Sequence, residues 1–360
     1  MATQADKDGP GFPPNVPTVH EGGARFRWLL IAQIIAGAGI IAFVLWRADL
    51  RETARVIGDA NYIYLLVALP LYLLAYLFWS YRSRLSLSRL GHISLSTLFE
   101  LYMAANMVNL IFPMRMGDLF RVRILSRRFG FRPGAVVTSV FVTETLFDGI
   151  VFALLFLWVL ALEGVPQVLL GLAWTLFAVV AVALVFAAST SRLQLHEGWE
   201  ERGPLRKLPP AARRIVSSFL PEVIDGLFLL KDIPLAARAL GATLTAWLVQ
   251  AAVYYVYARV FGIDISPTEA VVVMLTVALI ASVPIVPTGL GTYEAGVTGV
   301  LLLFGVGKGE ALAYAVGSHV LSLAFAIVVG SVGLLLLRIG PSDIVHLRQG
   351  VNSKAGQAID

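Results

Sequence analysis

The residues of this chain that could do chemistry are charged side chains inside long apolar runs. Glu144 and Asp148 lie four positions apart in the run 134–162, so a helix places both carboxylates on one face. An ionisable group at membrane depth costs roughly 2.5 to 3.5 kcal/mol and usually faces a cavity on a transport pathway. The pair predicts either a proton relay or cation site, or two structural ion pairs with arginines of the 115–132 segment.

A second group of charges follows a proline-containing stretch. Asp118 and Arg121 have the i, i+3 spacing of a helical ion pair, and Arg115 precedes them. A planar guanidinium binds phosphate oxygens in a bidentate manner. We therefore expect Arg115 or Arg121 to meet a phosphate group. The alternative is that both are ordinary anchors on the cytoplasmic side.

A third group lies in the last third of the chain. Glu294 follows Pro287, Gly289 and Gly291, and the glycines let the backbone turn so that a headgroup could approach peptide groups closely. His319 lies about ten residues into the last apolar run, where it could titrate near neutral pH. It is predicted either to act as a relay partner of Glu144 and Asp148 or to be a hydrogen-bonded packing residue.

The composition indicates that lipid surrounds these groups. Residues of the AVILMFWYC set make up 58% of the 360 residues and charged residues only 14%, against about 25% charged in soluble domains. The net charge of +5 fits Lys and Arg beside membrane spans, so no nucleic-acid partner is expected. The chain has no cysteine, which excludes disulfides and thiolate chemistry. No metal site or cofactor is predicted.

The predicted fold is an all-α polytopic membrane protein with about six full spans. A disordered tail (1–24) is followed by a single transmembrane domain (25–338), which contains a cytoplasmic loop at 190–232, and then by a cytoplasmic tail (339–360). Apolar runs long enough to cross a hydrocarbon core of roughly 30 Å lie at Trp28–Trp46, 62–81, 134–162, 167–189, 236–261 and 309–338.

Two further apolar runs are predicted to be re-entrant hairpins. The runs 95–112 and 268–286 are each interrupted or ended by proline in a glycine-rich stretch. Arginines flank 95–112 on both sides, and because such arginines belong on the cytoplasmic side, that run should enter the membrane and return. The same rule makes the 268–304 region dip from the outer side. Asn109, Pro113 and Gly117 would form the first turn, and Pro287, Gly289 and Gly291 the second.

The two hairpin regions resemble each other in sequence. The Pro113-x3-Gly117 and Gly130-x3-Gly134 spacings recur at 287–291 and 305–309, at an offset of 174 to 175 residues. Three predicted crossings separate the copies, so the second would be upside down. The sequence thus predicts an inverted-topology repeat, with copies at about 62–162 and 236–338. Repeats of this kind build alternating-access transporters.

Three motifs together resemble a known family. They are the stretch from Asn109 to Arg121, the stretch from Ser139 to Asp148, and the stretch from Pro287 to Glu294. They are similar to the flippase-like family that includes the transmembrane flippase domain of lysylphosphatidylglycerol synthetases. The chain has Thr145 where the family usually has arginine after the glutamate, and His319 near a position that is usually arginine. The resemblance implies transport of an aminoacylated phospholipid, a hopanoid or a polyprenyl-linked lipid.

The function expected from these features is that of a lipid flippase with a polar groove at the membrane midplane. The expected substrate is a phosphate-bearing membrane lipid, and proton or cation coupling and oligomer formation stay open. The expected location is the bacterial inner membrane, with both termini in the cytoplasm. The alternatives are an intramembrane enzyme that acts on a lipid carrier and a transporter of small solutes or ions. No HExxH, GxSxG or P-loop motif supports an enzyme.

Overall fold

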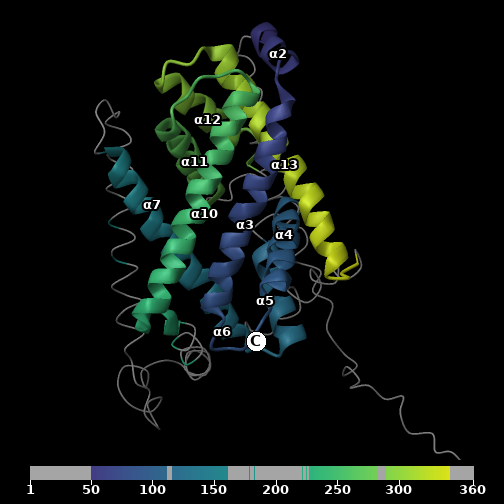
Figure 1. Ribbon diagram of the computed structural model, residues 1–360, viewed down its shortest axis with the longest axis vertical. Helices are drawn as coiled ribbons and strands as arrows, with labels where there is room; N and C mark the ends of the chain where they lie inside the picture. The colour runs from purple at the N-terminus through teal and green to yellow at the C-terminus, as the bar shows by residue number, and fades with distance from the viewer. Residues whose placement is uncertain are drawn as a thin grey trace, which may run out of the picture.

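The computed structural model describes residues 50–111, 116–160, 227–282 and 289–340, with a few isolated positions between them, and every regular element in these ranges is a helix (Figure 1). This confirms the predicted all-α class. Outside the described residues lie the tail 1–24, the runs Trp28–Trp46 and 167–189, nearly all of 190–232 and 339–360, and the residues Pro113, Arg115 and Pro287.

Four of the predicted spans are present as long apolar helices. Each is long enough and apolar enough to cross a membrane, and each covers the predicted run almost to its ends. They are η1 (Tyr62–Tyr64) continued by α3 (Leu65–Ser86), the continuous stretch of α6 (Pro133–Val137), η2 (Thr138–Thr143) and α7 (Glu144–Leu160), then α10 (Ile233–Val260) and α13 (Lys308–Leu336).

These long helices expose large apolar side chains on their outer surfaces. Leu66 of α3 and Leu335 of α13 are 71% and 76% exposed, and Ile63 and Val328 are exposed as well. Apolar surface of this extent is rare on soluble monomers and is the ordinary surface of a helix in lipid.

Shorter helices form two packed pairs. In the first, α4 (Leu95–Ile111) packs against α5 (Met116–Phe129), and in the second, α11 (Pro267–Ser282) packs against α12 (Thr292–Leu303). Figure 1 shows the first pair in the lower half of the molecule and the second in the upper half. A Cβ atom at Gly117 would overlap the Ala105 carbonyl, and the Gly117 amide donates to Asn109 Oδ1 at 2.6 Å. Glycine at 117 therefore lets α4 and α5 approach each other closely.

The order and lengths of these helices repeat along the chain. A shift of 175 residues, the distance from Gly130 to Gly305, moves α5 onto 291–304, and α12 occupies Thr292–Leu303. The same shift relates α3 to α10, α4 to α11, and the α6–α7 stretch to α13. Gly130 and Gly305 both have positive φ, 69° and 82°, within two residues of the end of the second short helix of each copy.

The corresponding helices α3 and α10 lie side by side and run in opposite directions. They pack against each other, and the amide of Asn61, just before α3, donates to the carbonyl of Val260, the last residue of α10, at 2.8 Å. The start of one helix therefore lies at the end of the other. Helix α2 (Leu50–Gly58) packs at this same end on the first turn of α13, where Thr53 donates to the Gly309 carbonyl at 3.3 Å.

Candidate functional site

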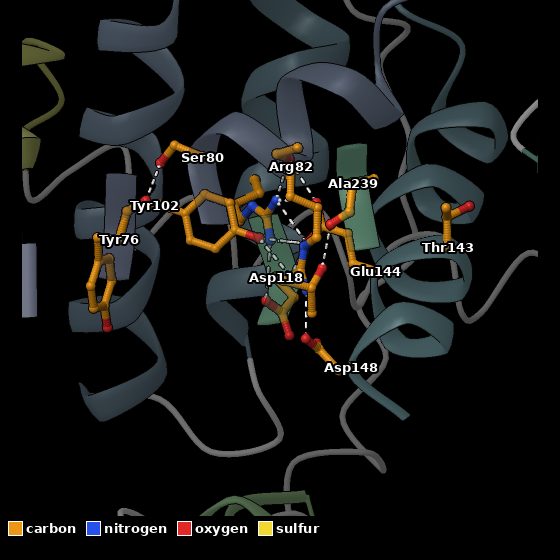
Figure 2. Close-up of polar contacts among 12 residues, drawn as sticks. Tyr76, Ser80, Arg82, Tyr102, Asp118, Thr143, Glu144, Asp148 and Ala239 are labelled. Atoms are coloured by element: carbon orange, nitrogen blue, oxygen red, sulfur yellow. Dashed lines mark hydrogen bonds and ion pairs between the residues drawn. The ribbon is translucent and has the colours of Figure 1, made fainter. Parts of the chain in front are cut away.

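A buried ionic cluster lies where α3, α4, α5 and α7 meet (Figure 2). Arg82 of α3 donates to Asp148 Oδ1 at 2.5 Å and to Glu144 Oε2 at 3.2 Å, so its guanidinium joins both carboxylates of α7. Arg121 of α5 binds Glu144 from the other side, with Nη2 at 3.1 Å from Oε1. Asp118 lies 4.0 Å from Arg121, at the edge of the cluster.

Neutral polar groups complete the surroundings of Glu144. Ser83 donates to Glu144 Oε1 at 2.7 Å, and the Tyr102 hydroxyl donates to Oε2 at 2.5 Å. The Arg121 guanidinium lies 3.8 Å from the centre of the Tyr102 ring. Glu144 thus accepts hydrogen bonds from three different helices, which fixes its carboxylate in one position.

Asp148 has a different environment, open on one side. Trp247 of α10 donates its indole N–H to Asp148 Oδ1 at 2.7 Å. The Trp247 ring packs edge-on against Phe152 and Trp79, with ring centres 4.7 and 5.2 Å away. The Asp148 side chain is 24% exposed, whereas the side chain of Glu144 is 5% exposed. Of the two carboxylates on α7, Asp148 is therefore the one that can be reached from outside the cluster.

A π-helical turn positions these carboxylates. The six residues of η2 directly precede Glu144, and the Thr143 hydroxyl donates to the Thr138 carbonyl, five residues back, at 3.3 Å. A π turn inserts residues into an α-helix, rotates the following face, and often occurs at functional sites. In this chain the π turn lies between the basic segment 115–132 and the helical face that carries Glu144 and Asp148.

The charges explain which sequence expectations hold. The interpretation that an arginine of the 115–132 segment pairs with a carboxylate applies to Glu144, through Arg121. Asp148 instead pairs with Arg82, one of the arginines before the 95–112 run that were expected on the cytoplasmic side. Arg82 lies between the two carboxylates and offsets the repulsion on which the expectation of a shared proton depended. Within the described residues the cluster holds two guanidiniums and three carboxylates.

Four members of this cluster were not predicted from the sequence. Arg82 is preceded and followed by other polar residues at the end of an apolar run, so only its 3% exposure sets it apart from Arg84 or Arg89. The other three, Ser83, Tyr102 and Trp247, are residue types that are common in membrane helices. No signal in the sequence links positions that are as far apart as 82 and 148.

A second polar cluster joins α12 to α13. His319 Nδ1 lies 2.7 Å from Glu294 Oε1, and both side chains are nearly buried. The Tyr293 ring stacks on the His319 ring, with centres 4.2 Å apart. The Gly291 amide donates to Glu294 Oε2 at 2.7 Å, and Gly289 and Gly291 turn the chain with φ of 75° and 81°. These glycines bring a backbone N–H to the carboxylate.

The structure therefore divides the predicted site residues into two groups. Asp118, Arg121, Glu144 and Asp148 belong to the first cluster. His319, which was a candidate relay partner of Glu144, has Glu294 as its carboxylate partner and belongs to the second. His319 thus contacts Glu294 rather than Glu144, because α13, which carries His319, packs against α12.

Comparison with known proteins gives one match over most of the chain. The family described as the lysylphosphatidylglycerol synthase TM region matches residues 30–330. This range includes both polar clusters, the first three long helices and α13 as far as residue 330. No curated protein matches the chain.

Proposed function

The chain belongs to the family of the lysylphosphatidylglycerol synthase TM region, an integral membrane domain, and we propose that it is a flippase that moves a lipid headgroup through the bilayer. The observation that carries this proposal is the buried ion cluster around Glu144. Buried charges are a poor means of stabilising a fold, because their desolvation offsets their attraction. In membrane helices they usually mark a substrate or ion pathway.

The charges in the cluster suggest how a phosphate-bearing headgroup would bind. Both Arg82 and Arg121 are already engaged by carboxylates, so a phosphate would compete with Glu144 or Asp148 for a guanidinium. Guanidinium groups bind carboxylate and phosphate oxygens with the same planar geometry, so a phosphate can occupy the position of a carboxylate. A headgroup would first meet the cluster at Asp148, whose side chain is partly exposed.

The same charges favour coupling to a proton or another cation. With three carboxylates and two guanidiniums described, the cluster carries one net negative charge when all are ionised. An added phosphate raises that charge further, and such repulsion is costly in a low-dielectric interior. Entry is favoured if a carboxylate takes up a proton or if a cation accompanies the lipid.

The arrangement of the helices supports alternating access. We propose that α4–α5 and α11–α12 are re-entrant hairpins of an inverted-topology repeat, since α3 and α10 correspond in the repeat and run antiparallel. In transporters with such repeats the site lies between the copies, near the midplane. The proposal extends to six spans, cytoplasmic termini and a location in the bacterial inner membrane.

The test is lipid exchange between leaflets. Purified protein is reconstituted into liposomes that contain headgroup-labelled anionic, zwitterionic or polyprenyl-phosphate lipids, and exchange is followed by quenching of the outer leaflet. Glu144→Gln keeps the size of the side chain but can neither take up a proton nor restore the ion pair with Arg121 after the headgroup has left. We expect exchange to slow by roughly tenfold or more, as for loss of a charge-assisted hydrogen bond worth about 1.5 to 3 kcal/mol. Wild-type protein that exchanges none of these lipids would contradict the proposal.

A chemical readout separates transport from the enzyme alternative. The labelled lipid is recovered after exchange and its mass is measured. A flippase returns the lipid unchanged, whereas a transferase or phosphatase returns a modified headgroup.

A further inference from the structure

Buried hydroxyl groups that lack a hydrogen bond gather around the π turn η2. Ser86, Thr138 and Ser139 are at most 1% exposed, and none of their hydroxyls bonds to another described residue. Thr138 and Ser139 begin η2, and Ser86 ends α3, which packs against η2. Burying a hydroxyl without a partner is costly, so such a group of hydroxyls indicates a bound ligand or an ordered water molecule.

Hydroxyls in other parts of the helices show how this cost is ordinarily avoided. Those of Ser80, Thr243 and Thr276 each donate to the carbonyl four residues earlier in the same helix, at 2.7 to 2.8 Å. Ser86 and Ser139 also follow helical residues at this spacing, but their hydroxyls make no such bond. Their oxygens are therefore available to a ligand.

The two serines lie at the same level of two neighbouring helices. Ser83 of α3 donates to Glu144, whereas the residue before Ser83 reaches Asp148, further along α7, so the two helices run antiparallel. Ser86 lies one turn beyond Ser83, and Ser139 lies five residues, about one π turn, before Glu144. Both serines are therefore displaced from Glu144 in the same direction, away from Asp148.

The second copy of the repeat supports this placement. The shift of 175 residues relates Ser86 to Phe261 and Ser139 to Tyr314. These two aromatic rings contact each other edge to face, with centres 6.3 Å apart. The first copy thus has two small hydroxyl side chains where the second copy has two packed rings, and the second copy offers no hydroxyl site at this contact.

The charge of the ionic cluster decides which ligand suits these hydroxyls. Three carboxylates and two guanidiniums leave one negative charge when all are ionised, and both guanidiniums are directed at the carboxylates. One helical turn, about 5 Å, separates the hydroxyls from Glu144. At this distance in a low-dielectric interior an anion would be repelled, whereas a single positive charge would offset the negative charge of the cluster.

We propose that Ser86, Thr138 and Ser139 bind a monovalent alkali cation at the π turn. Alkali cations are hard ions that exchange their hydration shell for neutral oxygen ligands, and π turns in α-helices are frequent at functional sites. The site deepens the proposed flippase function, on which the purpose of the ion rests, by naming the cation that accompanies the headgroup. With the ion bound, the cluster and its surroundings are neutral before a phosphate enters.

The test is the thermal unfolding of the purified protein in detergent, in sodium, potassium or choline chloride. The total salt concentration is held constant, so the screening of surface charges does not differ between samples. Choline is too large to take the place of an alkali ion among buried hydroxyls. We expect the unfolding temperature to rise as Na⁺ or K⁺ replaces choline, because a ligand that binds only the folded protein stabilises it.

Variants distinguish a bound ion from an ordered water molecule. In choline, Ser139→Ala and Ser86→Ala should be at least as stable as wild type, because each removes a buried hydroxyl that has no partner. In both variants the ion concentration that gives half of the stabilisation should rise roughly tenfold or more, which corresponds to about 1.4 kcal/mol. Ser80→Ala is the matched control on α3, since that hydroxyl already has a carbonyl partner, and it should leave the ion response unchanged.

Two results would overturn the cation site. One is an unfolding temperature that is the same in all three salts, and the other is an ion response that persists unchanged in both Ser139→Ala and Ser86→Ala. No lipid movement enters this measurement. If the ion stabilises the protein as expected while no lipid exchanges between leaflets, the cation site stands and the flippase proposal falls.

Discussion

At the scale of single residues, Arg82 holds the first cluster together. It is 3% exposed and bonds to two carboxylates that belong to another helix. A buried charge that loses its partner is far more costly than an intact pair, typically by 3 to 5 kcal/mol. The stability of the α3–α7 contact therefore depends on the balance of charges more than on their number.

We predict that Arg82→Gln lowers the unfolding temperature of the protein in detergent, because Asp148 then loses its cation and Glu144 retains only Arg121. Adding Asp148→Asn should restore part of the loss, since it removes the charge left without compensation. Arg127→Gln serves as the control because Arg127 is exposed. A double variant that is less stable than Arg82→Gln alone would contradict this account.

At the scale of elements, the close contact of α4 with α5 depends on Gly117. A Cβ atom there would overlap backbone of α4, which cannot move as a flexible side chain can. A hydrogen bond holds the two helices at this short distance, since the Gly117 amide donates to Asn109, a residue of α4. This hydrogen bond satisfies one of the N–H groups at the start of α5 that has no partner within its own helix.

We predict that Gly117→Ala destabilises the protein by about 1 to 3 kcal/mol, the usual cost of overpacking, and that it slows lipid exchange by forcing α4 and α5 apart. The matched control is Gly241→Ala, inside α10, where a Cβ atom meets nothing within 4 Å. That change should stabilise the helix by roughly 0.5 to 1 kcal/mol. The measurement is thermal unfolding in detergent. Equal unfolding temperatures for Gly117→Ala and wild type would show that the contact can relax.

At the scale of the whole molecule, the repeat places corresponding loops at opposite ends of the helix bundle. The positive-φ glycines that follow the second short helices, Gly130 and Gly305, lie at corresponding positions of copies whose first helices run antiparallel. Copies related in this way present the same loop to opposite sides of a membrane.

We therefore predict that Arg127→Cys and Lys308→Cys, both at exposed positions near these glycines, are labelled from opposite sides of the bilayer. The measurement is reaction with an impermeant thiol reagent in sealed vesicles, before and after permeabilisation. Unsubstituted protein is the control, because it contains no cysteine and should give no signal. Labelling of both positions from the same side would rule out an inverted repeat.

The class of protein and the places of the long helices follow from the amino-acid sequence alone. Apolar length and the absence of charge are local properties, so the four spans that the structure describes could be read within a few residues of their ends. The spacing of Pro and Gly likewise indicated the short helix pairs, since those residues act on their own backbone. The charges at Arg121, Glu144 and Asp148 were recognisable because ionisable groups are rare at membrane depth.

The tertiary structure alone decided which charge meets which. Arg82 and Asp148 are separated by 66 positions and meet only because α3 and α7 pack together. The contact of His319 with Glu294 could not be read from the sequence for the same reason, since it follows from the packing of α12 on α13. Ion pairs between helices are set by packing over long sequence separations, and a single sequence carries no record of that packing.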